Sequence, residues 1–182
     1  VNYKKPDRPF YDPDRAIYAL QAGCEQGEVL NCLLLADFID GVDVPPGVTA
    51  NLNRALALNE DLCRKTPSHS EDVRNYANAC WRTHRMLSGD EGLDNNQMLS
   101  SWALIRACEF DPGEFGSCDY AGASFYLGGN GVEKNERTAA TMWVRSCEQG
   151  RQADCVNAGR AFAQWGDDET AFKLQSESCD QT

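Results

Sequence analysis

A pattern centred on cysteine recurs five times along this chain. The aligned residues are Cys24, Cys63, Cys108, Cys147 and Cys179, spaced 39, 45, 39 and 32 residues apart. The position eight residues earlier is always small, with Ala16, Ala55, Ser100, Ala139 and Ala171. The position five residues earlier is apolar, with Ala19, Leu58, Ala103, Met142 and Leu174. A period in the range of about 20–50 residues is the signature of stacked structural repeats.

Glycine and proline separate apolar runs of helical period, which predicts an all-α protein. The expected helix pairs cover 13–26 with 28–40, 50–65 with 70–88, 95–109 with 115–127, and 136–149 with 151–165, and a last helix covers 167–179. Short connections make consecutive helices antiparallel. We therefore expect an extended arm at 1–12 and a single solenoid domain at 13–182, made of four helix pairs and a C-terminal capping helix.

Nine cysteines in 182 residues are more than a typical soluble domain carries, and none forms a C-x-x-C metal motif. Eight of them lie where one expected helix ends and the next begins, which favours disulfides over zinc. The expected pairs are Cys24–Cys32, Cys63–Cys80, Cys108–Cys118 and Cys147–Cys155. Disulfides need an oxidising compartment. We expect a periplasmic or secreted protein, with the mitochondrial intermembrane space as the second choice.

The charge balance narrows the range of partners. The chain has 17 Lys and Arg against 28 Asp and Glu, a net charge of −11. Phosphate backbones and anionic lipid surfaces repel such a protein, so we expect neither nucleic acid nor a membrane surface as partner. No apolar run approaches the roughly 20 residues that a membrane-spanning helix needs.

The stretch 115–162 resembles a Sel1-like repeat (SLR), a relative of the tetratricopeptide repeat. The resemblance rests on Ala121-Gly122, Gly128 to Asn135, Ala139, Met142-Trp143 and Cys147-Glu148-Gln149-Gly150. The Cys147–Cys155 spacing, followed by Ala158-Gly159, is similar to that of the disulfide-bridged members of the family. The resemblance is fair over 14–40 and weak over 50–92, where His84 stands at a position that the family fills with a small residue. It implies a disulfide-stapled α-solenoid.

Motifs for catalysis are missing from the sequence. It contains no H-E-x-x-H, no G-x-S-x-G and no phosphate-binding loop, and His69 and His84 are its only histidines. Some disulfide-bridged relatives have been linked to β-lactam binding or hydrolysis, but no Ser here has a Lys three residues later. We expect no enzyme, no cofactor and no metal, with a β-lactam-binding or hydrolysing enzyme as the alternative.

At two other positions of the repeat the residues are neither consistently small nor consistently apolar. Six residues before the aligned cysteine stand Tyr18, Ala57, Trp102, Thr141 and Lys173, and two residues before it stand Ala22, Asp61, Arg106, Arg145 and Glu177. These columns are four residues apart and share one face of the first helix of each pair. The resemblance places first helices on the concave side of the solenoid. The columns therefore predict a protein-binding face that includes Tyr18, Trp102, Arg106 and Arg145, although a solvated surface would show the same mixture.

The function that the sequence favours is a non-catalytic scaffold or adaptor that binds another protein or a peptide segment on the concave face. Aromatic and arginine side chains dominate the binding energy of protein interfaces. An assembly factor, an envelope adaptor and a toxin-neutralising immunity protein all fit this class equally well.

The first prediction concerns the cysteines. We expect peptide mapping of unreduced protein to recover the four bridges given above and one free thiol per chain at Cys179, whose repeat has no second cysteine. Recovery of eight further free thiols would contradict both the pairing and the oxidising compartment, and a covalent dimer through Cys179 would contradict the free thiol.

Overall fold

The computed structural model describes residues 12–41, 46–88, 93, 95–113, 116–129 and 131–180, without the side chains of 71 and 177–180. The expected arm, apart from its last residue, and the side chain of Cys179 lie outside this part. The described chain holds nine α-helices, each beginning and ending within three residues of the expected bounds. They are α1 (Pro13–Glu25), α2 (Val29–Ile39), α3 (Leu52–Arg64), α4 (Val73–Leu87, after a 3₁₀ turn at Ser70–Asp72), α5 (Gln97–Phe110), α6 (Ser117–Leu127), α7 (Glu136–Cys147), α8 (Gln152–Gln164) and α9 (Asp168–Asp180).

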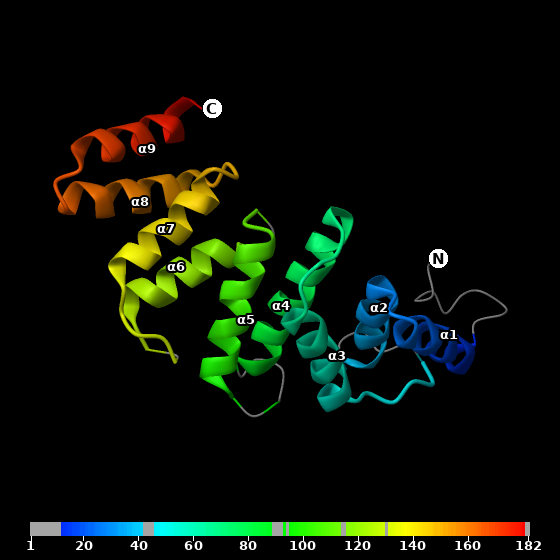
Figure 1. Ribbon diagram of the computed structural model, residues 1–182. Coiled ribbons are helices and arrows are strands. Elements are labelled where there is room, and N and C mark those ends of the chain that lie inside the picture. Colours follow the sequence, from blue (N-terminus) through cyan, green and yellow to red (C-terminus); the bar gives the residue numbers. More distant parts are fainter. Residues whose placement is uncertain are drawn as a thin grey trace.

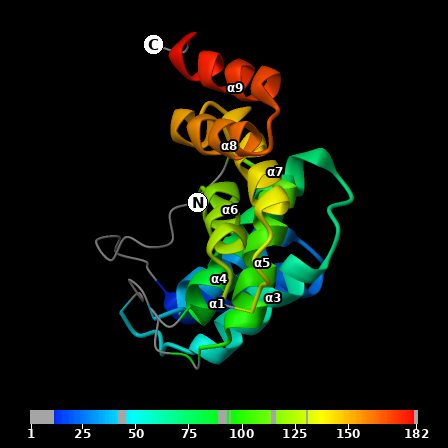
Figure 2. The ribbon, with the colours of Figure 1, turned by 90° about the vertical axis from the view of Figure 1, so that its left-hand side faces the viewer.

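The helices stack in chain order into an elongated solenoid. Figure 1 shows α1 and α2 at one end of the molecule and α8 and α9 at the other, and Figure 2 shows α8 and α9 stacked above the rest. Each helix packs mainly on the helices before and after it in sequence. The core is accordingly a row of apolar clusters, each shared by neighbouring helices. The structure confirms the all-α solenoid.

A disulfide joins the two helices of each pair. The four bridges link Cys24 to Cys32, Cys63 to Cys80, Cys108 to Cys118 and Cys147 to Cys155, which are the expected partners. Their Cα atoms are 4.6–4.7 Å apart, within the usual range for a disulfide. Such bridges are stable in an oxidising compartment outside the cytosol. None of the described helices has the length and apolar character to span a membrane.

The small column lies in the buried interior of the solenoid. All five of its members are buried, and Ala55 and Ala139 are fully inaccessible. The apolar column behaves differently at the N-terminal end. Ala103, Met142 and Leu174 are buried, whereas Ala19 is exposed because no repeat in the described chain precedes α1.

Cys-Glu-Gln-Gly marks the turn inside the first and fourth pairs. Gly27 and Gly150 both have positive φ, 89° and 86°, which a residue with a Cβ rarely adopts. Each donates its main-chain N–H to the carbonyl of the preceding cysteine, Cys24 (2.9 Å) or Cys147 (2.8 Å). The turn therefore closes next to the bridge that the cysteine forms.

A column that the sequence analysis did not single out forms the joints between pairs. It lies twelve residues before the aligned cysteine and holds Asp12, Asn51, Asn96, Asn135 and Asp167. In every copy the side-chain oxygen accepts a hydrogen bond from the main-chain N–H three residues later, at 3.0–3.1 Å. In the last four copies the main-chain N–H of the same residue donates to a carbonyl at or near the end of the preceding second helix: Ile39, Leu87, Phe125 or Phe162. One residue thus caps two helices.

The joint column generates the second prediction. Asn51→Ala removes the side-chain acceptor of the Arg54 N–H (3.0 Å) and should lower the free energy of unfolding by about 1 kcal/mol. In a domain of this size that corresponds to about 2–4 °C in Tm, measured by thermal circular dichroism. The control is Asn53→Ala, two residues on and exposed, which should leave Tm unchanged. Equal shifts in the two variants would contradict the capping interpretation.

Candidate protein-binding face and its surroundings

The column six residues before the aligned cysteine is open to solvent along the solenoid. Tyr18 on α1 is 77% exposed, Ala57, Thr141 and Lys173 are exposed, and Trp102 on α5 is half-buried. We call the surface formed by this column and the column two residues before the cysteine the first-helix face. Trp102 and Arg106 lie one turn apart on α5, whereas Tyr18 lies two helix pairs away on α1.

Trp102 takes part in a contact between neighbouring first helices. The guanidinium carbon of Arg64, at the end of α3, lies 4.9 Å from the centroid of the Trp102 ring. The indole also packs on the buried cluster around the Cys63–Cys80 bridge. The sequence analysis treated this column as free of packing, and at Trp102 the structure shows that the ring is both packed and partly accessible.

Arg106 is occupied by contacts inside the solenoid. Its guanidinium lies over the Phe110 ring, 4.3 Å from the centroid, and Nη1 pairs with Glu109 Oε2 at 2.9 Å. Nη2 donates to the carbonyl oxygen of Lys65 at 3.4 Å, and Lys65 is the C-cap residue that follows α3. A cation suits the C-terminal end of a helix, where unpaired carbonyls carry partial negative charge. Arg106 therefore ties α5 to α3.

Much of the remaining charge on this side of the first helices is also paired. Arg64 pairs with Glu60 at 2.5 Å, and Lys65 pairs with Asp61 at 2.6 Å. Arg145 on α7 differs, because it is half-buried and no carboxylate in the described part of the chain lies within ion-pair distance of it. A carboxylate brought by a partner would find Arg145 available.

Second helices carry a separate ion pair at the first joint. Arg82 on α4 pairs with Asp37 and, at 3.5 Å, with Asp40, both near the end of α2. All three side chains are largely buried, so solvent screens the interaction less than at the surface. This contact fastens the second pair to the first.

The fold brings His84 and Ser100 together at the α4–α5 joint. His84 Nδ1 lies 2.9 Å from Ser100 Oγ and 3.2 Å from the Ser100 carbonyl oxygen, while Ser100 Oγ donates to the His84 carbonyl oxygen at 3.1 Å. A carbonyl oxygen only accepts, so a tautomer with the proton on Nδ1 would satisfy the contact with the Ser100 carbonyl oxygen. Since Ser100 is only 4% exposed, the pair fastens the two helices.

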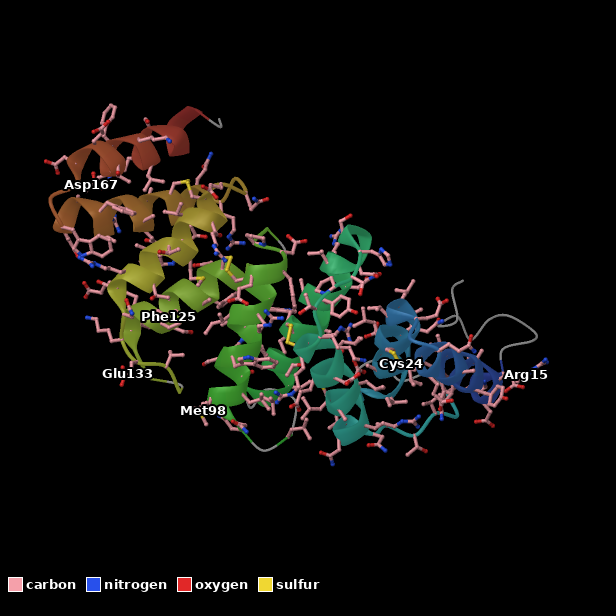
Figure 3. The ribbon with its side chains drawn as sticks, viewed as in Figure 1. Arg15, Cys24, Met98, Phe125, Glu133 and Asp167 are labelled. Carbon is pink, nitrogen blue, oxygen red and sulfur yellow. A yellow bond between two sulfur atoms is a disulfide. The ribbon has the colours of Figure 1, made fainter. Side chains whose placement is uncertain are left out.

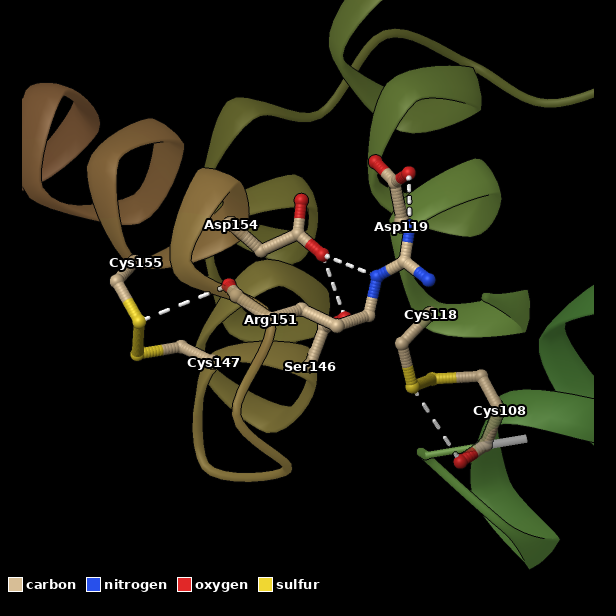
Figure 4. A network of polar contacts seen from close by, with 8 residues as sticks. All are labelled: Cys108, Cys118, Asp119, Ser146, Cys147, Arg151, Asp154 and Cys155. Carbon is tan, nitrogen blue, oxygen red and sulfur yellow. Dashed lines mark hydrogen bonds and ion pairs between the residues drawn. A yellow bond between two sulfur atoms is a disulfide. The ribbon is translucent and has the colours of Figure 1, made fainter. Parts of the chain in front are cut away.

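A buried polar network links the third and fourth pairs (Figure 4). Asp154 is 1% exposed and accepts a hydrogen bond from Ser146 Oγ at 2.5 Å. Arg151 donates from Nε to Asp154 (3.3 Å) and from Nη2 to Asp119 on α6 (3.1 Å). The sequence held a weak signal for this network. The residue directly before the second cysteine of each bridge is Asn31, Ala79, Ser117 or Asp154. Asp154 is the only ionisable residue among these four.

Asp119, on α6, has a raised pKa. Burial opposes ionisation and raises its pKa above the ordinary value of 3.8, and the nearby Asp154 carboxylate raises it further. Arg151 lowers it in part. Among the described residues, no group of three or more His, Cys, Asp or Glu side chains is placed to hold a metal ion.

These features define the class of the molecule: an α-solenoid with the SLR fold, stapled by disulfides. The sequence matches no protein-family model and none of the curated proteins. Among solved structures it is similar to a Sel1 repeat protein from Oxalobacter formigenes, with a TM-score of 0.60 and 15% identity over 98% of this chain and 69% of that one. It is also similar to c5321, a protective antigen of uropathogenic Escherichia coli with an SLR fold, with a TM-score of 0.57 and 20% identity over 93% of this chain and 34% of that one.

The third prediction follows from Asp119. A raised folded-state pKa means that this carboxyl contributes stability that is complete below the unfolded value of 3.8 and is lost as pH rises through the folded pKa. Asp119→Asn stays uncharged, so the stability of the variant relative to the parent should improve from acid to neutral pH. Urea unfolding between about pH 3.5 and 7 measures this change.

The control for this prediction is Asp14→Asn, which removes a negative charge from an exposed position on α1. A stability difference between Asp119→Asn and the parent that is constant across the pH range would contradict the prediction.

Proposed function

We propose that this protein is a non-catalytic scaffold that binds another protein, or a segment of one, on the first-helix face, in the periplasm or outside the cell. The observation that carries the proposal is the continuous exposure of one column across five stacked helices. That column includes a 77% exposed Tyr18 and a half-buried Trp102. Aromatic side chains held in place by neighbours lose little entropy on binding and commonly act as anchors.

The two arginines of the first-helix face have different roles in this proposal. Arg145 is available for a partner carboxylate, whereas Arg106 holds the end of α3. In this proposal Tyr18 and Trp102 supply apolar anchors, Arg145 supplies charge complementarity, and Arg106 keeps the surface between α3 and α5 in shape. The acidic remainder of the protein, with a net charge of −11, disfavours other acidic chains.

The solenoid architecture and the SLR-fold neighbours fit a scaffold that works by protein–protein interaction. Within that class, an envelope adaptor, an assembly factor and a toxin-neutralising immunity protein each use the same kind of surface. Identifying the partner separates them, and a pull-down from periplasmic or culture extract is the direct route.

The fourth prediction tests the face itself. Tyr18→Ala and Trp102→Ala should each weaken binding of the isolated partner by about tenfold or more, as anchor residues do, and Arg145→Glu should add to the loss. Isothermal titration calorimetry gives the dissociation constants. Arg106 is left intact, because its replacement would also disturb α3.

Matched controls lie on second helices. Tyr120→Ala on α6 removes a 53% exposed aromatic side chain, and Arg160→Glu on α8 reverses an exposed charge. Binding that falls in these controls, or that stays within a factor of two in the first-helix variants while circular dichroism shows an intact fold, would place the interaction on another surface.

A further inference from the structure

The last first helix, α9, differs from the other four in what lies beside it. It begins directly after Asp167, which Figure 3 labels, and no helix in the described part of the chain follows it. It packs mainly on α8. Ala171 and Leu174 are 4% and 6% exposed, and Leu174 belongs to the same buried cluster as Ala158 of α8. One side of α9 is therefore docked on the fourth pair.

In each of the four pairs, the second helix covers another side of the first helix. Four residues before the aligned cysteine, at most 7% exposed, stand Leu20, Asn59, Leu104 and Trp143. Leu104 clusters with Ala121 of α6. Trp143 clusters with Ala158 of α8. Seven residues before the cysteine, buried or partly buried, stand Ile17, Leu56, Ser101 and Ala140. Because residues three apart share one side of a helix, these two positions form a single strip.

The same strip is open to solvent on α9, where it consists of Phe172 and Gln175. We call it the α9 strip. Phe172 is 74% exposed, and Gln175 is also exposed. Removing a phenyl ring from water is favourable, so a segment that covers Phe172 gains the apolar contact that the other four first helices already have.

The repeat indicates which kind of segment fits the α9 strip. In the four described pairs the strip is covered by a helix, which the short connection makes antiparallel. Phe172 is larger than the residues at its position in the other copies. Since helix interfaces are packed as densely as crystals of small molecules, a helix that covers Phe172 needs a small residue, Ala or Gly, opposite the ring.

The charge of α9 favours a basic partner over a second copy of this chain. Its acidic residues are Asp168, Glu169, Glu177 and Asp180, and its only basic residue is Lys173. Two α9 helices from two copies would bring like charges together, which is unfavourable. A helix with Lys or Arg beside its apolar side is attracted instead.

We propose that the α9 strip binds an amphipathic helix of a partner protein, which docks as the second helix of a fifth pair. The partner helix has a small residue facing Phe172, apolar residues on the same side, and basic residues beside them. Recognition of one apolar helix side is a common mode of peptide binding. The inference goes beyond the proposed function, because the α9 strip is not part of the first-helix face.

The test uses a sixteen-residue helical peptide that has Leu and one central Ala on its apolar side and Lys elsewhere. One matched peptide has Glu in place of Lys, and another has Trp in place of the central Ala. Fluorescence anisotropy measures their binding to the intact disulfide-bonded protein at about 0.15 M salt. The first peptide should bind about tenfold or more tightly than either matched peptide.

Phe172→Ser should weaken binding of the first peptide about tenfold or more. The matched control is Met98→Ser on α5, which also removes an exposed apolar side chain (70%) and should leave binding unchanged. Circular dichroism checks that both variants remain folded. Equal binding by Phe172→Ser and the parent would show that the peptide responds only to the acidic surface, and would overturn the inference.

Two further outcomes separate this inference from its neighbours. Mass photometry that shows a dimer of the parent, dissociated by Phe172→Ser, would make a second copy the occupant and overturn the proposal of a basic partner helix. If the peptides fail to bind while Trp102→Ala still weakens binding of the isolated partner, the scaffold proposal stands and the α9 proposal falls. If the first peptide binds through Phe172 while partner binding ignores Tyr18 and Trp102, the first-helix face is wrong and the α9 proposal stands.

Discussion

The close contact between the two helices of each pair is the constraint on which the structure depends. At one end of each pair a disulfide holds the Cα atoms of its two cysteines 4.6–4.7 Å apart. A small buried residue lies two turns before the first of these cysteines. A helix pair of about 30 residues buries too little apolar surface to fold alone. Each bridge closes a loop of 8–17 residues, which in the chain-entropy model contributes about 2–3 kcal/mol. The bridges and the stacking together offset the thin core.

Stacking of the pairs depends on a different set of contacts at each joint. The cap residues Asn51, Asn96, Asn135 and Asp167 repeat at every joint and set the chain direction there. Around them the joints differ. The first uses Arg82 with two aspartates, the second uses His84 with Ser100, and the third uses Arg151 between Asp119 and Asp154. The backbone joint is thus general, whereas the side-chain contacts make each pair specific for its neighbour.

The same contacts shape the proposed function. Trp102 and Arg106 are held by Arg64 and by the end of α3, so the surface between α3 and α5 is preorganised. Preorganised side chains lose less entropy on binding than free ones. Arg145 is the member of the expected set whose charge has no intramolecular partner among the described residues, which makes it the best suited of the arginines to meet a partner carboxylate.

The sequence by itself determined the helices, their pairing and the bridges. These follow from the local period, the turn residues, the small and apolar columns at constant distances before Cys24, Cys63, Cys108 and Cys147, and the place of each partner cysteine near the start of the next helix. It also contained the cap column, which was readable as Asp or Asn twelve residues before each cysteine. Only the tertiary structure decided which members of the exposed columns are free. Arg106 and Arg145 occupy the same repeat position, yet Arg106 meets the carbonyl of Lys65, whereas Arg145 has no such contact with any residue that the structure describes. The physical reason is that such contacts join residues about 40 positions apart, and their geometry depends on how neighbouring pairs stack.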